Sequence, residues 1–135
     1  SGDEINNIIF EQNYGWPIAS YGKSYFDEDL RYKKDHASYN FKEPVFSFLP
    51  AIGISEIIKI PDSFTPFWKN NFILSSLNGL SLYRIKFNKN LDRIILHEKI
   101  YIGERVRDLK YSKKFKTILL ALESEGNLGI LNLND

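Results

Sequence analysis

The chain has 135 residues, of which 43% are hydrophobic and 15% aromatic, so it can bury the core of one domain and its composition argues against disorder. Its 18 basic and 17 acidic residues give a formal net charge of +1, which argues against a dedicated binder of nucleic acid or acidic polymers. The absence of Cys excludes disulfides, thiolate nucleophiles and Cys-based zinc sites, and no apolar run reaches the roughly 18–20 residues of a membrane span.

The first 42 residues combine one apolar run with a long polar segment. Ile5–Phe10 predicts a short strand, and Asn13–Gly22, which contains Gly and Pro, predicts a corner. We expect Trp16 to be a packing anchor at this corner. Residues 23–42 are charged and rich in Tyr without a sustained period of 2 or 3.6, which indicates a surface loop. Loops of this length are usually functional or docked on another element.

From Pro44 onward the sequence becomes a regular series of strand-length apolar runs. Turn residues separate these runs at intervals of roughly 8–12 residues, which is typical of an all-β sandwich, barrel or propeller. One helical turn is predicted within Phe64–Lys69, next to Pro61 and Pro66. The predicted strands are Glu56–Ile60, Phe72–Leu77, Leu80–Phe87, Arg93–Ile100, Arg105–Tyr111, Lys116–Glu123 and Leu128–Leu133.

The spacing of these strands indicates a repeat. Phe72 and Thr117 each begin a strand and lie 45 residues apart, which matches the roughly 40–50 residues of a four-stranded propeller blade. Two blades cannot close a ring, and the last array has only three visible strands, so a fourth strand should come from elsewhere. The sequence therefore predicts the tail of a β-propeller.

Five segments, in this order along the chain, carry a family resemblance: GDEIN…NYGWP, EPVFSFLPAIGIS, NNFILSSLNGLSLYRIKF, ERVRDLKYS and GNLGILNL. They resemble the C-terminal part of the soluble pyrroloquinoline-quinone (PQQ)-dependent sugar dehydrogenases, the glucose/sorbosone dehydrogenase family. The resemblance implies an all-β fold that is a partial β-propeller, roughly the last two to three four-stranded blades of a six-bladed ring. It also implies aldose sugar as substrate, PQQ and calcium as cofactors, and a periplasmic or secreted location.

The family frame assigns each part of the chain a place in one domain. Residues 1–22 are expected to form a strand and corner, and residues 23–42 a surface loop. Residues 43–103 are expected to form one blade, and residues 104–135 an incomplete last blade.

The R-x-R-D segment supplies two of the three candidate cofactor-binding residues. Family members hold the quinone's carboxylates and carbonyl oxygens with two arginines, which match Arg105 and Arg107 here. Two residues apart on a strand, both guanidinium groups point to one face and can each bind a carboxylate in a bidentate way, while Asp108 points the opposite way. The alternative is that the arginines are ordinary exposed residues paired with neighbours such as Glu104.

Other positions depart from the family pattern. Asn78 is the third candidate for cofactor binding, at a position where some members have a Lys. Leu49 and Ala51 stand where some members place a Trp and a Thr. These departures remove a cation, an aromatic wall and a hydroxyl, and they favour a propeller that has lost the quinone site and acts as a binding module.

We assign no catalytic residue and no metal ligand to this chain. The resemblance places the catalytic His in an earlier blade and the calcium-binding carbonyls just before GDEIN, beside Asp3 and Glu4. His36 is expected to be a solvated loop residue, and His97 to lie on the outer edge strand of its blade. The acidic run at residues 27–29 is interpreted as a solvated loop rather than a calcium site.

Three functional hypotheses follow. The first is the C-terminal part of a quinoprotein sugar dehydrogenase that is inactive as this segment alone. The second is the binding module, with no nucleic acid or membrane partner. The third is a partial chain, since Ser1 is not a Met and the sequence contains none, which associates into a homo-oligomer through open sheet edges.

Overall fold

The structure is a computed structural model and describes residues 2–24 and 32–133. The prediction of an all-β chain is confirmed, since the described helical elements are two short 3₁₀ turns, η1 (Ala37–Tyr39) and η2 (Pro66–Trp68). The described strands are β1 (Asp3–Ile5), β2 (Phe46–Phe48), β3 (Ile54–Lys59), β4 (Asn71–Ser76), β5 (Ser81–Phe87), β6 (Ile94–Tyr101), β7 (Val106–Ser112), β8 (Thr117–Leu122) and β9 (Leu128–Leu131).

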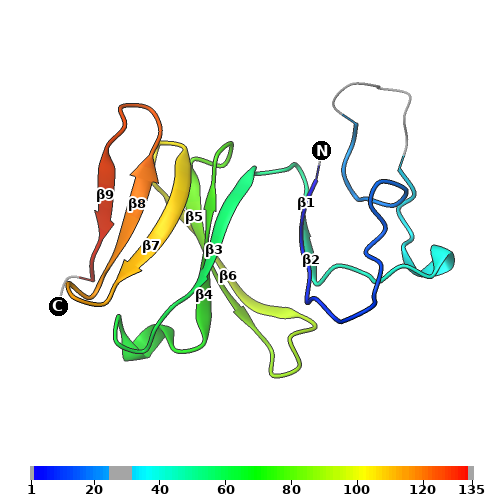
Figure 1. The fold of residues 1–135 in the computed structure, drawn as a ribbon, viewed down its shortest axis with the longest axis horizontal. Coiled ribbons are helices and arrows are strands. Elements are labelled where there is room, and N and C mark those ends of the chain that lie inside the picture. The colour runs from blue at the N-terminus through cyan, green and yellow to red at the C-terminus, as the bar shows by residue number, and fades with distance from the viewer. Residues whose placement is uncertain (1, 25–31, 134–135) are drawn as a thin grey trace. The chain divides into compact units, whose positions relative to one another are not determined.

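The chain divides into two compact units. The corner unit comprises Ser1–Ile52 with Lys89–Arg93, and the sheet unit comprises Gly53–Asn88 with Ile94–Asp135. β1 pairs with β2 in the corner unit, while the sheet unit holds the four-stranded antiparallel sheet β3–β4–β5–β6 and the three-stranded sheet β7–β8–β9 (Figure 1). The four-stranded sheet begins at Ile54 rather than near residue 43, because β2 pairs with β1 instead.

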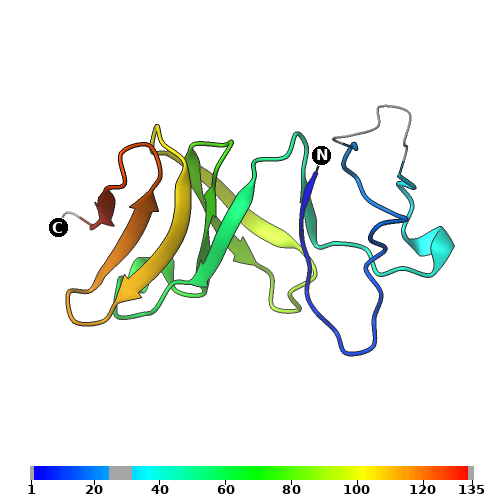
Figure 2. The same ribbon diagram turned by 45° about the horizontal axis from the view of Figure 1, so that its top comes forward.

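The two sheets of the sheet unit pack together through their apolar faces. β7 lies beside β3 in both views (Figures 1 and 2). The buried side chains between the sheets are Ile60, Ile73, Leu82, Val106, Leu109, Ile118 and Leu120. Each of them contributes about 1.5–3 kcal/mol by leaving water. β4 and β8 are the second strands of their sheets, as the 45-residue spacing predicts.

Polar contacts connect the two sheets, and a tight turn joins β4 to β5. The Ser55 hydroxyl lies 2.7 Å from the Ser75 hydroxyl of β4 and donates to the Val106 carbonyl of β7 at 2.5 Å. In the turn between β4 and β5, Gly79 is required because a Cβ there would lie 2.6 Å from the Ser76 hydroxyl. The candidate site lies at the end of the sheet unit that contains this turn and the contacts of Ser55.

The corner unit depends on turns and side-chain hydrogen bonds more than on strands. The Asn13 side chain accepts from Gly15 N at 2.8 Å, and Gly15 has φ of 94°, which favours glycine. The Tyr14 hydroxyl accepts from Ile9 N and donates to Asn7 O at 2.7 Å. These bonds place a tight turn at residues 13–15, within the segment predicted as a corner.

Two sequence predictions in the corner unit are wrong. The strand expected over Ile5–Phe10 ends at Ile5, and the chain then enters a turn in which Gln12 N donates to Ile9 O. Phe10 is 87% exposed there. Trp16 is not a packing anchor in this chain, because its side chain is 72% exposed and its ring contacts Tyr32. Apolar character alone does not distinguish a buried strand from an exposed turn.

Two further elements agree with prediction. η2 lies within the predicted helical turn, and the Thr65 hydroxyl caps it by accepting from Phe67 N at 3.2 Å. β6 is an edge strand of its sheet, as expected for the strand that carries His97. β9 is the edge of the three-stranded sheet, where the fourth strand is missing from the described residues.

Candidate functional site

One end of the sheet unit gathers the predicted cofactor-binding residues. The connection between β6 and β7 is tied to the turn between β4 and β5, because Ile102 N and Gly103 N both donate to Leu80 O at 3.0 Å. Asn78 lies in that turn and Arg105 lies in that connection. The two segments that carry the candidates therefore meet at the same end of the sheets.

Arg105 and Arg107 converge on a single carboxylate. Arg105 Nε lies 2.9 Å from Glu123 Oε2, and Arg107 Nη2 lies 2.7 Å from Glu123 Oε1. The two arginine side chains are 43% and 52% exposed, and that of Glu123 is 32% exposed. The cluster carries two positive charges and one negative charge, so it is a half-exposed cationic site. Its carboxylate comes from the end of β8 rather than from Glu104, which the alternative interpretation named.

A β-bulge at Arg107 places Asp108 on the same outer side of the sheet as Arg107. Val106 pairs with Leu122, and Asp108 pairs with Ala121, so Arg107 is the extra residue between them. The expectation that Asp108 points away from both arginines is wrong. Leu122 packs on the core, whereas Ala121 faces the other side of the sheet, and Asp108 shares that outer side. Simple alternation fails because the bulge adds one residue.

Several polar atoms of this cluster lack ideal partners. Glu104 Oε2, Arg105 Nε and Glu123 Oε2 are buried and have no hydrogen-bond partner. Arg105 Nε and Glu123 Oε2 are close enough for an ion pair but are not aligned for a hydrogen bond. Of these three atoms, only Glu104 Oε2 has neither a hydrogen-bond nor an ion-pair partner among the described residues, and a buried carboxylate oxygen favours a hydrogen-bond donor or water at this place.

The third candidate, Asn78, is uncharged and lies at the same end of the sheet unit. Gly53 packs against it closely, because a Cβ on Gly53 would lie 3.3 Å from Asn78 N. Leu77 N, the preceding amide, donates to Gly53 O at 2.8 Å. The structure thus brings Arg105 and Arg107 together on Glu123 and places Asn78 in a neighbouring turn.

The corner unit contains a second polar cluster, around His36. The expectation of a solvated loop residue is wrong, because the His36 side chain is fully buried. Its ring stacks on Tyr21, and its Nδ1 lies 3.6 Å from Glu43 Oε2. Its Nε2 lies 4.0 Å from Glu4 Oε1. The burial of His36 could not be predicted from its polar sequence neighbours, because a loop that folds back on the domain can bury single side chains.

Glu43 organises this cluster through three hydrogen bonds. It accepts from His36 N at 3.1 Å, from Ala37 N at 3.2 Å and from the Tyr21 hydroxyl at 2.9 Å. The hydrogen bond to Glu43 is the main reason why the pKa of Tyr21 is raised above its ordinary value. Nearby, the Lys34 ammonium donates to Ser20 O and Gly22 O, and burial lowers its pKa.

His97 lies outside both clusters. It sits on the edge strand β6, opposite Ile85, and its ring stacks on that of Tyr83 at 5.6 Å. Burial raises the pKa of Tyr83. An exposed histidine on an edge strand has no enclosed space in which to act on a substrate.

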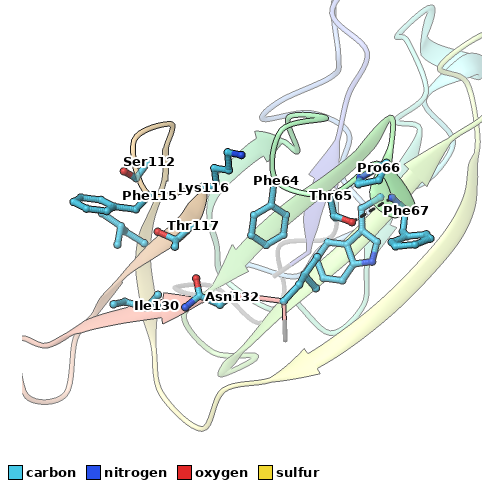
Figure 3. Close-up of a pocket in the computed structure, with 13 residues that line it drawn as sticks. Phe64, Thr65, Pro66, Phe67, Ser112, Phe115, Lys116, Thr117, Ile130 and Asn132 are labelled. Atoms are coloured by element: carbon cyan, nitrogen blue, oxygen red, sulfur yellow. Dashed lines mark hydrogen bonds between the residues drawn. The ribbon is translucent and has the colours of Figure 1, made fainter. Parts of the chain in front are cut away.

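An apolar groove lies at the other end of β8. Its lining residues include Phe64, Phe115 and Thr117 (Figure 3). Glu123 follows the opposite end of β8. Among the residues that line it, only Lys116 is ionisable. The groove therefore lacks the charges needed for an anionic cofactor, and the arginine cluster is the stronger candidate site.

Metal and membrane features are limited within the described residues. There, no group of three or more His, Asp or Glu side chains is placed to hold a metal ion. The acidic run at residues 27–29 lies outside the described residues. Among those that are described, no helix is long and apolar enough to cross a membrane.

Comparison with known proteins gives matches along nearly the whole chain. The family model of the glucose/sorbosone dehydrogenases matches residues 1–130. The chain is 28% identical over 127 residues to the uncharacterized protein slr1608 of Synechocystis sp., covering 94% of this chain and 30% of that protein. It is 26% identical over 129 residues to the aldose sugar dehydrogenase YliI of Escherichia coli K12, covering 94% and 34%. The chain thus spans about a third of the length of these relatives.

Solved structures share the fold. A glucose dehydrogenase matches with a TM-score of 0.85 and 22% identity, over 98% of this chain and 39% of that one. The soluble aldose sugar dehydrogenase of E. coli in its apo-form matches with a TM-score of 0.76 and 22% identity, over 96% and 37%. The predicted fold, a partial β-propeller, is confirmed.

Proposed function

Because the chain belongs to the glucose/sorbosone dehydrogenase family, we propose that it is the C-terminal part of a quinoprotein that oxidises aldose sugars with PQQ. The observation that carries this proposal is the convergence of Arg105 and Arg107 at one end of the sheet unit. The YliI relative is by name an aldose sugar dehydrogenase, which supports the substrate class. A periplasmic or secreted location belongs to the same proposal.

The residues present fit an anionic quinone. The two guanidinium groups are half exposed and leave N–H donors that Glu123 does not use, so each arginine can bind a carboxylate or carbonyl oxygen of the ligand. Asn78 would add a neutral donor or acceptor from the neighbouring turn. The bound quinone would accept the hydride from the sugar.

This chain contributes binding rather than proton transfer. His97 is on an exposed edge strand, and His36 is buried among Glu4, Tyr21 and Glu43 in the corner unit. We therefore place the catalytic base, and most calcium ligands, in parts of the protein outside these residues. On this proposal the chain alone does not catalyse sugar oxidation.

The test begins with the gene. The complete reading frame that contains this chain should encode a Gly-Pro before GDEIN and a His in an earlier blade. The protein expressed from that frame should reduce a dye in the presence of aldose, PQQ and calcium. A correctly folded full-length protein without this activity, at any PQQ concentration, would contradict the proposal.

A double variant tests the placement of the cofactor site. Arg105→Ala with Arg107→Ala should weaken PQQ binding at least about 100-fold, because two charge-assisted contacts are lost. PQQ binding is measured by absorbance titration in the full-length protein. The matched control is Lys110→Ala, which removes an exposed positive charge from the same strand. Equal affinities in the double variant and the control would overturn the placement.

A binding module without the quinone is the second candidate. It is favoured by Leu49, Ala51 and Asn78, which stand where some family members have an aromatic residue, a hydroxyl and a cation. Leu49 is 58% exposed, so it offers an apolar surface rather than a polar contact. This function predicts that the full-length protein folds and yet does not bind PQQ in the same titration.

We also propose that the chain on its own associates through the open edge of β9. Its exposed residues Leu128 and Ile130 are apolar, and an unprotected edge strand is a template for pairing with a second copy. Light scattering should show a dimer or larger species, and Ile130→Lys should shift it toward the monomer. A monodisperse monomer of the unchanged chain at the working concentration would refute this proposal.

A further inference from the structure

Glu123 is the hub of the arginine cluster, although sequence patterns do not single it out. Each of its carboxylate oxygens faces a different arginine, at 2.9 Å for Arg105 and 2.7 Å for Arg107. Arg105 immediately precedes β7, Arg107 is the second residue of β7, and Glu123 follows the end of β8. The contact therefore depends on the pairing of two strands and not on local sequence.

The main chain holds Glu123 independently of its side chain. Its backbone N–H donates to the Arg105 carbonyl at 3.0 Å, and the preceding Leu122 pairs with Val106 in the ladder. Replacement of the carboxylate therefore leaves the strand pairing in place. The Glu123 side chain is a third exposed and contributes to the cluster rather than to the core.

Electrostatics explains what the carboxylate does there. Two guanidinium groups that approach the same point repel each other and lose side-chain freedom when they are ordered. A carboxylate between them offsets this repulsion and holds both groups in place before a ligand arrives. The remaining N–H donors of each planar guanidinium are then available in a fixed arrangement.

We propose that Glu123 is a positioning residue, which pre-orders Arg105 and Arg107 for a ligand with carboxylate groups and keeps the net charge of the three-residue cluster at +1. The inference rests on the proposed function, because it takes the anionic quinone as the ligand. The role is distinct from binding, since Glu123 repels an anion and acts only through the arginines. Pre-ordering lowers the cost of immobilising side chains when the ligand binds.

The test compares Glu123→Ala with Glu125→Ala in the full-length protein. Glu125 lies in the same turn between β8 and β9, is exposed and carries the same charge, so its removal controls for net charge. Absorbance titration with PQQ should show at least about tenfold weaker binding for Glu123→Ala and little change for Glu125→Ala. Without PQQ, the melting temperatures of the unchanged protein, Glu123→Ala and Glu125→Ala should agree within about 2 °C, because the core is untouched.

Salt dependence and a conservative variant separate positioning from a general structural role. Without Glu123 the cluster carries a charge of +2, so the logarithm of the dissociation constant should rise more steeply with the logarithm of salt concentration. Glu123→Asp retains the charge and should recover affinity to within about threefold of the unchanged protein. If Glu123 only supports the fold, Glu123→Ala should instead lower the melting temperature, and that result would contradict the positioning role.

The outcomes separate this inference from the proposed function. If the double arginine variant loses PQQ binding while Glu123→Ala binds as the unchanged protein does, the positioning role is wrong and the cofactor site stands. Tighter binding by Glu123→Ala would mean that Glu123 competes with the ligand, which also overturns the inference. If the double arginine variant binds PQQ normally, the cofactor placement itself fails.

Discussion

The sheet unit and the corner unit are stabilised in different ways. The sheet unit buries seven apolar side chains in one cluster between two antiparallel sheets. The described part of the corner unit has two three-residue strands, and its buried groups include Ser20 and His36. Burial of apolar area is non-directional, whereas buried polar groups need specific partners. We therefore expect the sheet unit to tolerate polar changes better than core truncation, and the corner unit to depend on single polar side chains.

The largest effect is expected from truncation of the sheet unit's core. Ile73→Ala, at a fully buried position of β4, should lower the free energy of unfolding by about 2–5 kcal/mol, because it removes apolar contacts and leaves a cavity. Urea denaturation measures the change. The control is Ile95→Ala on the edge strand β6, where the side chain is half exposed and the loss should stay below about 1 kcal/mol. Similar losses at both positions would contradict a core between the sheets.

An intermediate effect is expected from the hydrogen-bond hub of the corner unit. Glu43→Ala removes the acceptor for three hydrogen bonds and should cost about 1–3 kcal/mol. Hydrogen exchange of backbone amides should accelerate in the corner unit and not in the sheet unit. Glu43→Gln retains an acceptor oxygen and should restore most of the protection. If hydrogen exchange accelerated equally in both units, the two units would unfold together, and the prediction would be wrong.

The smallest effect is expected from Tyr21, which should make the free energy of unfolding fall at alkaline pH. The pKa of Tyr21 is raised chiefly by its hydrogen bond to Glu43, so the fold favours the neutral phenol. The stability that this bond contributes is fully present below the ordinary Tyr pKa of about 10, and it is lost as pH rises through the higher pKa of the folded state. Tyr21→Phe should be less stable at neutral pH and should show a weaker decline in this alkaline range. Urea denaturation at a series of pH values measures both; parallel curves for the two proteins would contradict the assignment.

The regular part of the fold was predictable because its strands follow a simple physical pattern. Between Glu56 and Leu133 every predicted strand overlaps an observed one, since apolar runs bounded by turn residues have few alternatives. β2 was not predicted, because its three residues lie between Pro44 and Pro50 and resemble a loop. Its strand character comes from pairing with β1, which is a contact distant in sequence.

The candidate site was predictable only in part. The R-x-R-D segment singled out Arg105 and Arg107 through the family resemblance, and their spacing and charge suit carboxylate binding. Glu123 was missed, since only the pairing of β7 with β8 brings it to the arginines. His36 was taken for a solvated residue because its neighbours in sequence are polar, whereas its burial depends on Glu4, Tyr21 and Glu43. Contacts between residues that are distant along the chain cannot be predicted from the local sequence.

The bulge at Arg107 has a consequence for how the protein can change over generations. An in-frame loss of the Arg107 codon would make Val106–Leu122 and Asp108–Ala121 consecutive pairs, so the ladder would become regular. The mutant chain would fold with one irregularity fewer, and it would lack half of the cationic pair. Selection for stability alone would therefore accept this deletion. Retention of the residue across generations would record selection on a role of Arg107 that is independent of the fold, such as the ligand binding proposed above.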